Sequence, residues 1–160
     1  ELHPEKTRLI EFGRFAVDTR AGRKERKPET FDFLGFTHIC SKTKNGKFCV
    51  LRKTKRKKMQ AKLKAMRAEL RSRMHDAVPA VGKWLRSVLT GHYNYYGVPR
   101  NLPALYNFHN EVIRLWMLVL KRRSQKNRIT WERMERLIAH WLPRPTIRHP
   151  YPDQRLCVKT

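Results

Sequence analysis

The chain has 160 residues, with 37 Lys and Arg against 13 Asp and Glu, which gives a formal charge of +24 at pH 7. This imbalance excludes a typical enzyme of small molecules and indicates a polyanionic partner, with nucleic acid ahead of an anionic membrane. The hydrophobic fraction of 40% and the four Trp exclude a disordered basic tail, because they provide enough apolar side chains for a packed core.

The sequence contains no run of about 18 apolar residues, so it predicts no membrane span. Its first residues show no signal-peptide pattern, and without an initiator Met we expect a fragment of a longer protein. The three cysteines, Cys40, Cys49 and Cys157, are odd in number and widely spaced. Because no CxxC pair is present to hold zinc, we expect a reduced, cytoplasmic protein without a structural metal.

The N-terminal residues predict one strand followed by a loop. Leu9, Ile10 and Phe12 form a short apolar run after Pro4, which favours a strand. Residues 18–29 are charged, contain glycine and show no periodicity. We therefore expect a surface loop or a disordered link there.

A β-hairpin is predicted next. The alternating aromatic residues of TFDFLGFTH, at 30–38, favour a single strand in which Gly35 marks a close approach. Asn45-Gly46 is the strongest short hairpin signal, so we expect a return strand over 48–51. The turn carries three lysines that could reach a partner: Lys42, Lys44 and Lys47.

Residues 52–73 are the centre of positive charge, with eleven basic residues and one acidic residue. Like charges crowded on one helix cost stability unless a polyanion offsets them, so we expect nucleic-acid contact. The alternatives are an ordinary solvated face, a calmodulin-binding helix and a membrane-surface helix. The apolar residues recur at helical spacing and predict one buried face: Met59, Leu63, Met66 and Leu70.

Residues 78–97 predict a second helix, with Lys83, Arg86 and His92 opposite its apolar face. The three tyrosines within 93–96 cannot all face one core, so at least one ring should reach solvent or a partner. Cations and aromatic rings on one helix suit RNA contact, and the alternative is a core helix with a tyrosine-rich end. The apolar residues recur at three and four: Val81, Trp84, Leu85, Val88, Leu89, Tyr93 and Tyr96.

Two further helices are predicted, over 103–123 and after Thr130, whose hydroxyl would cap the last one. Trp131 belongs to the apolar side of that last helix. The predicted fold is therefore α+β and mainly α: a short strand and a β-hairpin followed by a bundle of three to four helices. We assign five side chains to its core: Trp84, Leu85, Leu89, Trp116 and Trp141.

The pattern W-L-x-x-x-L-x-G-x-Y-N-Y-Y-G, at 84–97, resembles the maturase-specific region of group II intron reverse transcriptases. The F-x-F-L-G-F run at 31–36, followed by a hairpin and a basic helix, resembles the segment that joins the palm of these enzymes to their thumb. LHPEKTRLIEF at 2–12 resembles the last palm strands, and NRITWERMERL at 127–137 resembles the end of the thumb. The resemblance covers nearly the whole chain.

This resemblance implies three regions: the end of the palm with its hairpin at 1–52, a helical thumb and maturase domain at 53–142, and an extended, Pro-rich basic tail at 143–160. In the family, the thumb holds the template–primer duplex and, together with the maturase region, grips the intron RNA and assists its splicing. The implied partners are structured group II intron RNA, an RNA–DNA or RNA–primer duplex, and a separate palm-containing chain, with no membrane.

The family is an RNA-directed DNA polymerase that uses paired aspartates of a Tyr-x-Asp-Asp motif to hold two Mg²⁺ ions. No two acidic residues are adjacent in this sequence. We therefore expect this chain to be inactive alone and to hold no cofactor, with Mg²⁺ bound only by the missing palm.

Thirteen residues are candidates for RNA contact. The alternatives to RNA binding by a splicing cofactor are a subunit or fragment of an active polymerase completed by a palm outside this chain, and a generic basic nucleic-acid-binding protein. The candidates are Lys53, Lys55, Arg56, Lys57, Lys58, Lys62 and Arg67 for phosphates, Tyr95, Tyr96 and Arg100 for the maturase surface, and Lys42, Lys44 and Lys47 for the hairpin.

Overall fold

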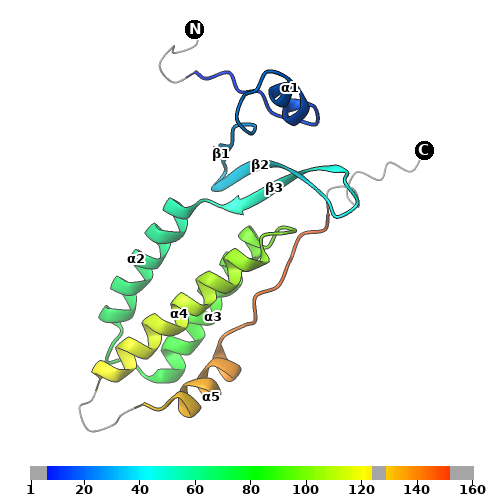
Figure 1. The fold of residues 1–160 in the computed structure, drawn as a ribbon. Helices are drawn as coiled ribbons and strands as arrows, with labels where there is room; N and C mark the ends of the chain where they lie inside the picture. Colours follow the sequence, from blue (N-terminus) through cyan, green and yellow to red (C-terminus); the bar gives the residue numbers. More distant parts are fainter. Residues whose placement is uncertain (1–6, 124–128, 152–160) are drawn as a thin grey trace. The chain divides into compact units, whose positions relative to one another are not determined.

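The computed structural model describes residues 7–123 and 129–151. The fold is α+β and mainly helical, as predicted, with one antiparallel sheet followed by a group of helices (Figure 1). The chain divides into two compact units, Glu1–Lys55 and Arg56–Thr160. The predicted boundary after residue 52 lies three residues before this division of the chain.

The first unit contains a three-stranded sheet in the order β1 (Phe31–Phe33), β2 (Phe36–Lys42) and β3 (Phe48–Thr54). The predicted hairpin is confirmed, because β2 pairs with β3 in antiparallel register along their whole length. The loop between them uses Gly46 at a φ of +75°, a left-handed conformation that glycine adopts without steric cost.

Residues 30–38 do not form the single strand that we predicted. Leu34 and Gly35 have φ values of +46° and +78° and turn the chain between β1 and β2. Two successive positive φ values are the signature of the tight turn that joins twisted antiparallel strands. Asp32 of β1 accepts a hydrogen bond of 2.6 Å from the Thr37 hydroxyl of β2, which ties the two strands together beside this turn.

The N-terminal predictions are also wrong in part. Leu9 is fully exposed and belongs to no strand, whereas the helix α1 (Ala16–Gly22) overlaps the start of the loop predicted at 18–29. This helix has seven residues, about two turns, which is too short to show a hydrophobic period. The Thr19 hydroxyl donates a 2.9 Å hydrogen bond to the Phe15 carbonyl oxygen and supports its first turn.

The cysteines of the sheet lie on neighbouring strands but on different faces. Cys40 of β2 stands opposite Val50, and Cys49 of β3 stands opposite Ser41. Directly opposed residues share a face and successive residues alternate between faces, so Cys40 and Cys49 point to opposite sides of the sheet. The register therefore gives no disulfide between them. Cys157 lies outside the described residues.

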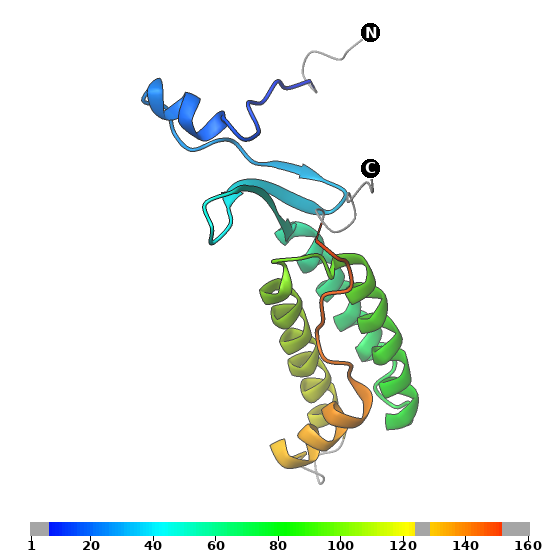
Figure 2. The same ribbon diagram turned by 90° about the vertical axis from the view of Figure 1, so that its right-hand side faces the viewer.

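The second unit consists of α2 (Arg56–Ser72), α3 (Val78–Tyr96), α4 (Leu102–Arg122) and α5 (Trp131–Trp141), which confirms the four predicted helices. The Thr130 hydroxyl accepts a hydrogen bond from the Arg133 backbone N–H and caps α5 as predicted. From 142 to 151 the chain forms neither helix nor strand, and it runs back along the helices towards the end of α3 (Figures 1 and 2).

The core of this unit lies between α3 and α4, with contributions from α2 and α5. Three of the predicted core residues are at most 1% exposed, namely Leu85, Leu89 and Trp116, whereas Trp84 and Trp141 are only partly buried. Trp131, predicted on the apolar side of α5, is 58% exposed. Other side chains with 0% exposure are Leu70, Tyr93, Leu105, Phe108, Val112 and Met134.

Two glycines of the α3 region are explained by close packing. An added Cβ at Gly82 would meet the Trp141 ring of α5 at 2.5 Å, so this glycine lets the two helices approach. Gly97 has a φ of −74° and is therefore not the left-handed cap that its place after α3 suggests. Instead its carbonyl oxygen accepts a hydrogen bond of 2.7 Å from the Arg148 N–H. An added Cβ would clash with the Tyr93 carbonyl oxygen of α3 and would lie 3.0 Å from the Arg148 nitrogen of the returning chain.

Candidate nucleic-acid interface

The helix α2 separates an apolar side from a cationic side. Met66 and Leu70 are buried in the core, and Met59 and Leu63 pack against it, which confirms the predicted apolar stripe. The basic side chains occupy the remaining surface, and each belongs to an exposed residue. They are Arg56, Lys57, Lys58, Lys62, Lys64, Arg67 and Arg71.

The first turn of α2 is electrostatically unusual, because Arg56, Lys57 and Lys58 lie there without any acidic residue. The N-terminal end of a helix carries partial positive charge, so cations at this end destabilise it. The unpaired N–H groups of the same turn favour a bound anion. This arrangement is unfavourable for the isolated protein and favourable for a complex with phosphate groups.

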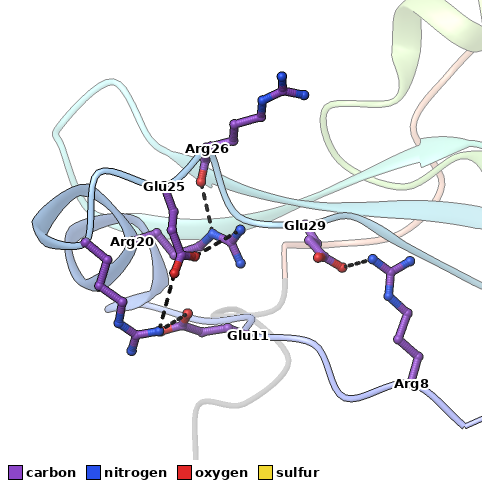
Figure 3. Close-up of polar contacts among 7 residues, drawn as sticks. Arg8, Glu11, Arg20, Glu25, Arg26 and Glu29 are labelled. Carbon is purple, nitrogen blue, oxygen red and sulfur yellow. Dashed lines mark hydrogen bonds and ion pairs between the residues drawn. The ribbon is translucent and has the colours of Figure 1, made fainter.

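Several arginines of the first unit pair with carboxylates. Arg8 pairs with Glu29 at 2.6 Å, and Arg20 pairs with Glu25 at 3.2 Å (Figure 3). The seven exposed cations of α2 have no such carboxylate within 4 Å among residues 7–123 and 129–151. The Glu69 carboxylate, the one acid of that helix, pairs with Arg73 at 2.7 Å. The cations of α2 therefore keep their charge available for an external anion.

A groove of about 550 Å³ lies between α2 and α3, and it brings together two parts of the predicted site. Lys58 and Lys62 come from α2, and Tyr95 and Tyr96 come from α3. We call this the aromatic groove. Its remaining lining residues are Met59, Ala61, Ser87, Val88, Gly91 and His92.

The three tyrosines at the end of α3 divide as predicted between core and surface. Tyr93 is fully buried, and its hydroxyl lies 2.8 Å from Nδ1 of His109. Tyr95 is 51% exposed, and its ring makes a T-shaped contact with the Tyr96 ring, with centroids 4.7 Å apart. The Tyr95 ring therefore presents a large part of its surface at the aromatic groove.

His92 does not lie on the polar face of α3, where we predicted it. It is 7% exposed, and its ring stacks on Phe108 of α4 with centroids 3.7 Å apart. Burial, and to a lesser extent the positive charge of Lys62, lowers the pKa of His92 to about 4. The imidazole is therefore neutral at physiological pH, and it forms an uncharged wall of the aromatic groove.

A second groove of about 360 Å³ lies between α2 and α4. Its floor is aliphatic and includes Leu118, which is 51% exposed. Arg67 belongs to this groove, and so do two cations that we did not select from the sequence, Arg71 and Arg122. We call it the arginine groove, and its other lining residues are Met74, Leu115 and Val119.

The remaining candidates lie elsewhere. Lys53 is exposed on β3 of the first unit, whereas the Lys55 ammonium is 2.8 Å from the Asp32 carboxylate and is partly neutralised by it. Arg100 is exposed between α3 and α4, with a left-handed φ of +68°. The predicted hairpin cations are all exposed and belong to the first unit: Lys42, Lys44 and Lys47.

Two cations near the predicted charge centre have structural partners. The Arg86 guanidinium donates to the Trp141 and His140 carbonyl oxygens at the end of α5, where positive charge complements the helix dipole. Arg73 lies over the Trp84 ring, 5.1 Å from its centroid. Both side chains hold helices together, so we leave them out of the interface.

Within the described part of the chain, no three His, Cys, Asp or Glu side chains gather into a group that could hold a metal ion. Of the helices described, none has the length and apolar character needed to cross a membrane. Comparison of the chain with protein-family models, curated proteins and solved structures finds no match.

Proposed function

We propose that this chain binds RNA as the thumb and maturase portion of a group II intron reverse transcriptase, where it supports intron splicing and holds the template–primer duplex. The observation that carries RNA binding is the exposed side of α2, with seven cations and no carboxylate partner for them among the described residues. The order of the motifs at 31–36, 84–97 and 127–137 supports the family.

The physical argument for a nucleic acid is the cost of the unbalanced charge. Lys57 and its neighbours oppose the helix dipole, and the cations along α2 repel one another. A polyanion relieves both effects, and releasing its condensed counterions adds a favourable entropy to binding. Folded RNA fits this surface through its phosphates and 2′-hydroxyls, because a protein reads A-form helices by shape rather than by base edges.

The same proposal predicts the roles of the candidate residues. Lys58 and Lys62 contact phosphates beside the aromatic groove, and Arg67 contacts phosphates beside the arginine groove. We place this function in the cytoplasm, where thiols such as those of Cys40 and Cys49 remain reduced.

The experiment is a binding titration with folded group II intron RNA and with duplex DNA, at matched near-physiological salt and with excess tRNA as competitor. We expect binding to the folded RNA to survive the competitor and binding to DNA to be lost. Equal, competitor-sensitive binding to both would instead mean that charge alone drives association, and it would overturn the proposal in favour of a generic basic nucleic-acid-binding protein.

A salt titration on the same RNA counts the phosphate contacts. The logarithm of the affinity should fall linearly with the logarithm of the salt concentration, by about 0.9 per phosphate contacted. Lys58→Gln and Lys62→Gln should each reduce this slope by about one, whereas Arg133→Gln, at an exposed cation of α5, should leave it unchanged. A salt-independent affinity would contradict phosphate contact.

A further inference from the structure

The aromatic groove has the size and composition of a ligand site. Its volume of about 550 Å³ lies within the range of small-molecule sites, roughly 300–1,000 Å³. Lys58 and Lys62 supply positive charge from α2, and Tyr95 supplies a ring face from α3. Apolar contacts come from Met59 and Val88. A planar aromatic ligand with an attached anionic group matches this combination of side chains.

Gly91 is the observation that points to an occupant. Glycine inside a helix destabilises it relative to alanine, so a glycine in the middle of α3 needs a reason. At Gly82 the reason is the Trp141 ring, and at Gly97 it is the Tyr93 carbonyl oxygen together with the returning chain. An added Cβ at Gly91 would meet nothing within 4 Å, so no described part of this protein requires the open space there.

His92 adds a second unexplained feature to the same wall. Its Nε2 is buried and has no hydrogen-bond partner among the described residues. Buried polar atoms in proteins are nearly always hydrogen-bonded, so the described residues leave this atom of the groove wall unexplained. Because the ring is neutral, a ligand seated against it meets no positive charge there, and the cations remain at Lys58 and Lys62.

We propose that the aromatic groove holds one unstacked nucleotide of the bound RNA, with its base against Tyr95 over Gly91 and its phosphate at Lys58 and Lys62. This inference rests on the proposed RNA-binding function. Splayed bases stack on aromatic side chains in most sequence-specific RNA recognition, and each such stack accounts for roughly a fivefold to hundredfold change in affinity on alanine substitution. A base inside a duplex cannot enter the groove, because its faces are covered by neighbouring pairs.

The test uses two RNA hairpins of equal length, one with a single bulged adenosine and one with a fully paired stem. We expect the wild-type chain to bind the bulged hairpin about tenfold more tightly than the paired one. Gly91→Leu and Tyr95→Ala should remove this preference by weakening binding of the bulged hairpin to the level of the paired one. Tyr95→Phe keeps the ring and should keep the preference.

Gly91→Ala is the matched control for folding, because its methyl group enters open space and should reduce the preference only slightly. A second readout is 2-aminopurine in place of the bulged adenosine. Its fluorescence should be quenched by the wild-type chain and by Tyr95→Phe, and it should be unchanged by Tyr95→Ala.

The outcomes separate this inference from the proposed function. If the wild-type chain binds both hairpins equally and more tightly than duplex DNA, the nucleotide site is wrong and RNA binding stands. A preference that persists in Gly91→Leu also overturns the nucleotide site. If neither hairpin is preferred over duplex DNA, the proposed function itself fails.

Discussion

The two grooves that border α2 both carry positive charge, but they differ in the uncharged side chains that line them. The aromatic groove combines Lys58 and Lys62 with the rings of α3, whereas the arginine groove combines Arg67 and its neighbours with aliphatic side chains. Cations alone attract any phosphate backbone without discrimination. Ring faces select unstacked bases, so the comparison indicates that affinity is spread along α2 while discrimination between RNAs belongs to the aromatic groove.

Charge reversal should have the largest effect on RNA binding at the two grooves. Both Lys58→Glu/Lys62→Glu and Arg67→Glu/Arg71→Glu should weaken binding of structured RNA by about 100-fold to 1,000-fold, because each variant replaces attraction to phosphates with repulsion. The lysine pair should also lose the preference for the bulged hairpin, and the arginine pair should keep it. Binding of the two hairpins by each variant at constant salt measures both effects.

The control for charge reversal is Arg133→Glu/Arg136→Glu, which changes the net charge equally at exposed positions of α5. We expect less than a threefold change in affinity for this variant, because exposed charges more than about 10 Å from the RNA are screened. A loss as large as that of the α2 variants would mean that binding follows net charge and not the two grooves.

Lowering the pH should affect the aromatic groove through its wall residue His92. The arginine groove should be unaffected, because its lining residues are Arg, Met, Leu and Val. His92 has a folded pKa of about 4, against about 6.5 in the unfolded chain. Between these values the unfolded chain binds more protons, so the free energy of unfolding falls as the pH is lowered from 6.5 to 4. The loss should reach about 2 to 3 kcal/mol, and urea denaturation across this pH range measures it.

His92→Phe should flatten this pH dependence, because phenylalanine keeps the stack on Phe108 and cannot bind a proton. A smaller dependence of the free energy of unfolding on pH should remain, since burial also lowers the pKa of His109. If His92→Phe loses stability with acid as steeply as the wild-type chain, the titration of another group governs the transition.

Two glycines of α3, Gly82 and Gly91, differ in whether protein atoms fill the space beside them. Gly82→Ala places a methyl group 2.5 Å from the Trp141 ring and should destabilise the fold by about 2 kcal/mol. Gly91→Ala adds a methyl group to open space and should stabilise it by up to about 1 kcal/mol. Urea denaturation of both variants tests the opposite signs, and destabilisation by Gly91→Ala would mean that protein atoms occupy the aromatic groove.

The sequence predicted the helices α2 to α5, the β2–β3 hairpin and the exposed cations, because each leaves a local signal in periodicity, turn chemistry or charge. It missed α1, whose seven residues are too few to show a hydrophobic period. It did not predict the place of His92, since α3 contacts both α4 and α5 and a helix with several neighbours lacks a single polar side. Nor could it predict either groove, because a groove depends on which helices lie side by side. The traces of the aromatic groove in the sequence are its cations, its tyrosines and Gly91, a helix-destabilising residue inside the motif.

The smallest predicted effect concerns Lys57, whose substitution should change the stability of the fold and the affinity for RNA in opposite directions. Lys57 lies in the first turn of α2, where a negative side chain interacts favourably with the helix dipole. Lys57→Glu should therefore stabilise the fold by about 0.5 kcal/mol while it weakens RNA binding about tenfold, and Lys57→Gln should lie between the two in both measurements. The gain in stability should vanish in 1 M salt, where the Debye length is about 3 Å. A variant that loses stability together with affinity would show that Lys57 serves the fold, whereas opposite changes are expected of a cation kept for an external phosphate.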